Sequence, residues 1–140
     1  MNRVSLIIKG TLQLLIGWGG IASGLMFIIA PDGSLMGFST EPLIDAPSKD
    51  YLIPGILLLV LIGIGHIFAA ILSFNKNRFS HYFDTVIGSA MAIWIIVQLA
   101  IIGYESFLQP LILTLAIIEI LIGLLLFCKY KNKVRLRNHK

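Results

Sequence analysis

Charge is the first property that this sequence has little of. Only 13% of its 140 residues are Asp, Glu, Lys or Arg, which is about half of the share found in soluble domains. Hydrophobic residues make up 57% of the chain. A soluble fold of this size needs a charged surface to stay in water, so the surface of this protein must face an apolar medium. The length is enough for one domain.

The residues needed for several kinds of chemistry are also scarce. A single cysteine, Cys128, excludes an intrachain disulfide. One histidine and one carboxylate lie within the apolar segments, too few for a metal site, which usually needs three or four ligands. Gly63 and Gly65 do not make a dinucleotide fingerprint, because no strand precedes them and the third glycine is missing. We therefore expect no metal, no cofactor, no catalytic residue and no nucleic acid partner.

Long apolar segments, in contrast, are abundant. A membrane-spanning helix needs roughly 20 apolar residues. Four nearly uncharged segments reach this length, at about residues 10–30, 51–74, 85–104 and 106–128. The sequence therefore predicts an all-α fold, an integral membrane four-helix bundle formed by one transmembrane domain over residues 1–140.

The basic residues predict the direction of these spans. Ten of the 11 Lys and Arg residues lie before the first span, between the second and third, or after the fourth, and only Lys49 lies elsewhere. Basic residues are retained on the cytoplasmic side, so we expect both termini, including the tail 129–140 that ends in Lys140, to be cytoplasmic. A cleaved signal peptide is the alternative, but the first apolar segment is longer than the roughly 7–15 residues of such a peptide.

Two segments outside the spans allow two interpretations each. The outer loop 31–50 mixes acidic with apolar residues, so it either covers the outer mouth of the bundle or forms an ordinary interfacial loop. The tail is a topology anchor, or it contacts anionic lipid, where each basic residue is worth about 1 kcal/mol. The basic residues concerned are Lys129, Lys131, Lys133, Arg135 and Arg137.

Glycines recur on one face of each span. Small residues allow helices in lipid to approach closely, and spacings of three and four place residues on one helix face. The helix-packing candidates are Gly17, Gly20, Gly24, Gly63, Gly88 and Gly123. Such faces build either a four-helix bundle or a surface for a homo-oligomer or membrane partner, and the motif alone does not distinguish them.

Ionisable and polar-tipped side chains lie near the middle of the spans, where a charge costs at least about 2.5–3.5 kcal/mol. They are Trp18, His66, Trp94, Gln98 and Glu119. We expect them to form one polar layer that lines a small cavity, with Glu119 as the proton-responsive group. The alternative is a buried polar cluster that only fixes the register of the helices. His81 lies outside the predicted spans and is expected to be solvated.

One short motif resembles a known group. The stretch Tyr51-Leu52-Ile53-Pro54-Gly55, followed by Gly63-Ile64-Gly65-His66, resembles a pattern of small bacterial four-span membrane proteins without assigned function. The layout of the loops is similar to that of the DoxX-type four-helix proteins. The resemblance implies a bacterial plasma-membrane location and no site residue.

Three functions follow as hypotheses. The glycine faces and the basic tail favour an accessory or interaction subunit of the membrane. The polar layer around Glu119 and His66 favours a carrier of a small molecule, lipid or proton-coupled substrate. An enzyme acting on a lipid or quinone would need more convergent polar groups than the sequence provides.

Overall fold

The fold is all-helical, with helices joined by turns and loops and no strand, over the part of the chain that its computed structural model describes, residues 3–138. Lys140 lies outside the described residues. Four long helical segments follow one another, with two short 3₁₀ turns, η1 (Ser34–Met36) and η2 (Glu41–Leu43), after the first. The helical segments are α1 (Arg3–Ile29), the run of α2 (Leu52–Leu57), η3 (Leu58–Ile64) and α3 (Gly65–Phe74), α4 (Ser80–Ile102), and α5 (Leu108–Asn138).

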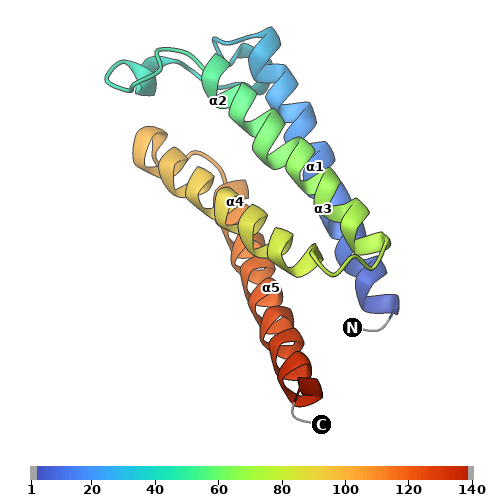
Figure 1. The fold of residues 1–140 in the computed structure, drawn as a ribbon. Helices are drawn as coiled ribbons and strands as arrows, with labels where there is room; N and C mark the ends of the chain where they lie inside the picture. Colours follow the sequence, from blue (N-terminus) through green and yellow to red (C-terminus); the bar gives the residue numbers. More distant parts are fainter. Residues whose placement is uncertain (1–2, 139–140) are drawn as a thin grey trace.

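These segments form two antiparallel hairpins, shown in Figure 1. In the first hairpin, α1 packs along α2, η3 and α3; in the second, α4 packs along α5. Fewer contacts join the two hairpins to each other. We call the end that holds the start of α1, the turn 75–79 and the end of α5 the basic end, and the end that holds the segments 30–51 and 103–107 the acidic end.

Each of the four segments is long and apolar enough to cross a membrane. Most of the large apolar side chains on their outer faces remain exposed in the isolated chain, among them Leu15, Val86 and Leu125. Soluble monomers rarely expose contiguous apolar surface on this scale. The four apolar helices therefore indicate a multi-pass membrane protein.

The predicted glycine faces pack inside the chain, and all six glycines are buried. A Cβ at Gly20 would lie 2.7 Å from the backbone nitrogen of Gly63, so the first two segments approach backbone to backbone. In the second hairpin, a Cβ at Gly88 would lie 3.0 Å from the carbonyl oxygen of Ala116. The glycines could pack helices within the bundle or form a surface for a partner, and in the structure they pack helices of the same chain.

Three helix boundaries differ from the sequence prediction. Helix α1 begins at Arg3, not near residue 10, and α4 begins at Ser80, not near residue 85. Both extensions bring a charged residue into an apolar helix, Lys9 in α1 and Asp84 in α4, and the two charges neutralise each other. Helix α5 continues through the basic tail, because Lys, Arg and Leu are good helix formers.

The acidic end is held together by an apolar cluster that includes the outer loop. Buried residues Phe27, Leu43, Tyr51 and Ile102 pack together there. The rings of Phe27 and Tyr51 stack with 4.9 Å between their centroids, and the Tyr51 hydroxyl donates a hydrogen bond to the Ser39 carbonyl at 2.8 Å. The outer loop is therefore folded back over both hairpins.

The close packing at Gly20 generates a stability prediction. Gly20→Ala should lower the midpoint of thermal unfolding in detergent, since forcing a methyl group into a packed site costs about 1–3 kcal/mol. Gly19→Ala is the matched control, because no atom lies within 4 Å of a Cβ at Gly19. An equal change of the midpoint in both variants would contradict the packing described here.

Candidate functional site

A cavity of about 600 Å³ lies between the two hairpins in the half of the bundle nearest the acidic end. Its wall combines residues of both hairpins with Met36, Gly37 and Phe38 of the outer loop. The wall is mostly apolar, and its polar side chains are Ser23, Gln98, Glu105, Ser106 and Gln109. A volume of this size is typical of small-molecule sites, which hold about 300–1,000 Å³.

The cavity ends on a thin apolar floor. Ile62 and Met91 line the cavity and pack with Ala116, and all three are buried. His66 lies one helical turn beyond Ile62, and Glu119 one turn beyond the wall residue Leu115. At a rise of 1.5 Å per residue, one turn separates them by roughly 5–6 Å along the helix axes.

His66 and Glu119 contact each other beneath this floor. The Nε2 atom of His66 lies 3.0 Å from Oε2 of Glu119, and both side chains are buried. The second carboxyl oxygen, Oε1, is buried and has no hydrogen-bond partner among the described residues. Buried polar atoms normally have partners, and one that has none calls for an explanation.

The hydrogen bonds determine how this pair carries its proton. Nδ1 of His66 lies 2.7 Å from the carbonyl oxygen of Ile62, which can only accept, so Nδ1 bears a hydrogen. Nε2 then either accepts from a protonated Glu119 or donates to its carboxylate. Both arrangements share one mobile proton and leave the pair without net charge.

The helix that presents His66 is irregular at this point. Residues 58–64 form the π-helical segment η3, directly before α3. Such segments are rare inside α-helices and are frequently found at functional sites. Here η3 supplies both the floor residue Ile62 and the carbonyl that orients the imidazole.

The predicted polar layer is only partly assembled. His66 and Glu119 meet, while Trp94 and Gln98 line the cavity on the other side of the floor. Trp18 is 60% exposed and does not line the cavity, which corrects that part of the prediction. The buried face of α1 carries Gly17, and the next residue points about 100° away from it.

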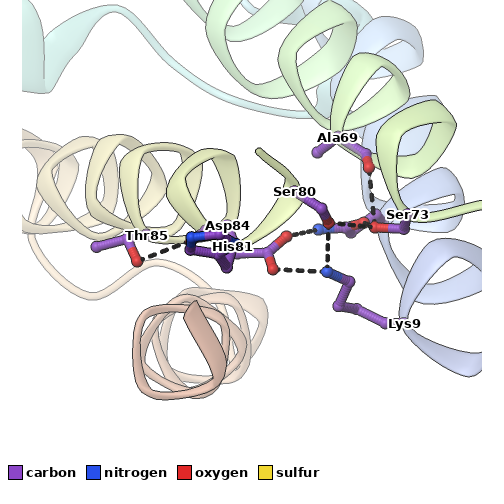
Figure 2. Close-up of polar contacts among 8 residues, drawn as sticks. Lys9, Ala69, Ser73, Ser80, His81, Asp84 and Thr85 are labelled. Carbon is purple, nitrogen blue, oxygen red and sulfur yellow. Dashed lines mark hydrogen bonds and ion pairs between the residues drawn. The ribbon is translucent and has the colours of Figure 1, made fainter. Parts of the chain in front are cut away.

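A second polar cluster, which the sequence analysis missed, lies at the basic end (Figure 2). We call Lys9, Gln13, Ser73, Ser80 and Asp84 the basic-end network. Lys9 Nζ donates to Oδ2 of Asp84 and to Oγ of Ser80, both at 2.6 Å. Nε2 of Gln13 donates to Oδ1 of Asp84 at 2.8 Å.

Two serines complete this network. Ser73 Oγ donates to Oε1 of Gln13 at 2.8 Å and lies 3.2 Å from Oγ of Ser80. The five residues thus form a closed ring of hydrogen bonds between α1, α3 and α4. All five side chains are buried.

His81 also departs from the expectation that it is solvated. Its side chain is buried beside the network, and its Nε2 has no hydrogen-bond partner among the described residues. The ring centroid lies 4.3 Å from that of Tyr82 and 5.6 Å from that of Tyr130. These aromatic rings shield the imidazole at the basic end.

The periodicity of the helices contained a signal for the missed residues. Lys9 and Gln13 precede Gly17 at spacings of four, so they extend the same buried face of α1. Asp84 precedes Gly88 by four residues in the same manner. Lys9 was used only as a topology signal, so the extension of these two buried helix faces toward the basic end was not recognised.

The contact between His66 and Glu119 generates a stability prediction. His66→Leu should lower the free energy of unfolding by about 3–5 kcal/mol, because it leaves a buried acid without its partner. The double variant His66→Leu/Glu119→Leu should be more stable than His66→Leu alone. Denaturant titration in detergent measures both, with Trp18→Leu as a control at an exposed site; strictly additive losses would mean that the two residues are not coupled.

Comparisons with protein-family models, with curated proteins and with solved structures find no match to this chain. The resemblance to DoxX-type proteins therefore stays a prediction from the sequence. We infer the function from the cavity, the His66–Glu119 pair and the distribution of charge.

Proposed function

We propose that this protein is a multi-pass protein of the bacterial plasma membrane, with both termini cytoplasmic, that binds and carries a small apolar molecule. Its binding site is the cavity between the hairpins, and the His66–Glu119 pair makes binding responsive to protons. The observation that carries the proposal is the juxtaposition of a cavity of about 600 Å³ with a buried ionisable pair one turn beneath its floor.

The wall of the cavity favours an apolar ligand with a small polar group. Phe27, Phe38 and Trp94 provide aromatic surface. Gln98 and Trp94 carry polar atoms for which we find no hydrogen-bond partner within residues 3–138, so a hydroxyl or carbonyl group of a ligand would satisfy them. Ligand sites of this kind combine an apolar wall with a few polar groups that fix the orientation.

The charge around the cavity disfavours anionic ligands. No Lys, Arg or His is among the described residues that line it, whereas Glu105 is. Burial together with the negative charge of Glu105 raises the pKa of Tyr51, which lies at the same end. Hydrogen bonds from Ser34 lower the pKa of Asp32, so this acid stays ionised. We therefore propose an uncharged or cationic ligand that enters from the acidic end.

The proton-responsive role follows from the surroundings of the pair. Glu119 is packed against α4 at Gly88, and the nearest charged group on that helix is Asp84, which is neutralised by Lys9 of α1. The other titratable groups of α4 are His81 and Tyr82, which lie in its first turn at the basic end. No Lys or Arg contacts the pair within the described residues, so a gained or lost proton changes its net charge.

The distribution of charge supports the proposed orientation. Basic residues of the described chain gather at the basic end, and the acids Asp32, Glu41, Asp45, Asp50 and Glu105 lie at the other. The end rich in Lys and Arg is the cytoplasmic one by the positive-inside rule. The bacterial assignment rests on the resemblance of the sequence motif.

The structure provides less support for the accessory-subunit hypothesis than the sequence pattern alone. One of its two motivations was the set of glycine faces, and these pack within the chain. The other was the basic tail, which forms the exposed last turns of α5. In this position the basic side chains could bind anionic lipid or a partner protein, or they could act only as a topology anchor.

A variant that fills the cavity tests the binding function. Gln98→Phe should reduce the amount of small molecule or lipid that native mass spectrometry detects on protein purified in mild detergent, because the new ring occupies the cavity. Ile93→Phe is the matched control, since Ile93 lies on the same helix and is exposed on its outer face. A wild-type protein that retains nothing, or an equal loss in both variants, would contradict the proposal.

The role of Glu119 generates a pH prediction. Histidine is the side chain whose ordinary charge change falls between about pH 5 and 8. Uptake of a second proton gives the pair a positive charge beneath an apolar floor, which draws in water, so retention of the ligand should fall as the pH is lowered. In the double variant His66→Gln/Glu119→Gln, which leaves neither group of the pair to take up a proton, this dependence should disappear, as measured by native mass spectrometry after equilibration at each pH. An unchanged dependence in the double variant would rule out the His66–Glu119 pair as the responsive group.

A further inference from the structure

We propose that the basic-end network is the closure that seals the cavity from the cytoplasmic side, and that the structure is the state in which the cavity is reached from the acidic end. This inference rests on the proposed function. It assigns Lys9, Gln13 and Asp84 to an inner gate that opens when the two hairpins part at the basic end.

The polar contacts between the hairpins lie toward the basic end of the bundle. Lys9 and Gln13 of α1 and Ser73 of α3 bind Ser80 and Asp84 of α4 at the basic end. The His66–Glu119 contact lies between this network and the cavity. Toward the acidic end, the hairpins meet around the cavity and through the apolar cluster of Phe27 and Ile102. Within residues 3–138, the polar side-chain contacts between the hairpins thus lie in the half below the cavity.

Water can replace these contacts. The donors and acceptors of the ring are satisfied by one another in the closed arrangement (Figure 2). Each of them can bind water equally well if the basic end opens, whereas separation of tightly packed glycine faces would expose apolar surface or leave a void. A polar interface can therefore open without leaving its groups unpaired, as a switching element must.

The segment that joins the two hairpins is short and can serve as the hinge. The turn 75–79 is the covalent link between the hairpins, and the network residues Ser73 and Ser80 flank it directly. Lys76 in this turn has a positive φ of 50°. A rotation of one hairpin about this short link would move Lys9 away from Asp84 and bring the acidic ends of the hairpins together.

A buried ion pair also adds little stability to an interface that never opens. The desolvation of two charges offsets most of their attraction, and apolar residues of similar volume often give equal or greater stability. The ring instead provides a contact that is specific when dry and easily hydrated when open. This is the behaviour required of a gate.

The experiment is a pair of distances measured by electron spin resonance in lipid nanodiscs, in a Cys128→Ser background. Spin labels at the exposed positions Ile8 and Val86 report on the basic end, and labels at Ile29 and Ile101 report on the acidic end. The variant Lys9→Met/Asp84→Asn removes both charges and leaves no unpaired charge in the interior. We expect it to lengthen the basic-end distance by several ångströms and to shorten the acidic-end distance.

Lys129→Gln is the matched control, because it removes an exposed basic charge outside the network and should leave both distances unchanged. If the double variant does not yield a monodisperse protein, Gln13→Leu removes two bonds of the ring, keeps the ion pair, and should shift both distances in the same directions by less. Distances equal to those of the wild type in the measured network variant would overturn the gate. The distances are measured without ligand, so a failure of the gate is separate from a failure of ligand binding by native mass spectrometry.

Discussion

Every polar side chain buried between the two hairpins must find its partner within the protein, because the helices that carry it are otherwise apolar. Two buried pairs satisfy this constraint, the Lys9–Asp84 ion pair and the hydrogen-bonded His66–Glu119 pair, and each joins the first hairpin to the second. Each pair is a neutral unit, so no net charge is buried. Their position fixes how the hairpins meet, closed toward the basic end and separated around a cavity toward the acidic end.

The chain uses two different kinds of contact for two different purposes. Within each hairpin, glycines allow helix backbones to pack closely, as Gly20 and Gly63 do. Neither water nor lipid could replace these close contacts if the helices separated. Between the hairpins, hydrogen bonds and ion pairs dominate the basic half. Each hairpin is therefore built as a unit, while the interface between the hairpins can exchange its partners for water.

The sequence predicted the parts of the fold that depend on periodicity and missed those that depend on distant partners. The number of long apolar helices and the positions of the glycine faces follow from local composition and spacing, and the structure contains both. Lys9 was read only as a topology signal and Asp84 was left outside the predicted spans, because the partner of each charge lies 75 positions away in the sequence. Trp18 was assigned to the polar layer only because of its depth in the span. Its side chain lies on the exposed side of α1 and therefore outside the site.

The order of layers along the bundle links the proposed binding site to the proposed gate. From the acidic end inward come the cavity, the apolar floor at Ile62 and Met91, the His66–Glu119 pair, and the ring around Asp84. The pair is separated from the cavity by the floor and from the basic end by the ring, so it has no open route to water on either side. Under the proposed function, a proton reaches Glu119 only when one of these layers is displaced. Protonation of the pair and movement of the hairpins are then linked, because each arrangement of the hairpins exposes the pair to a different side.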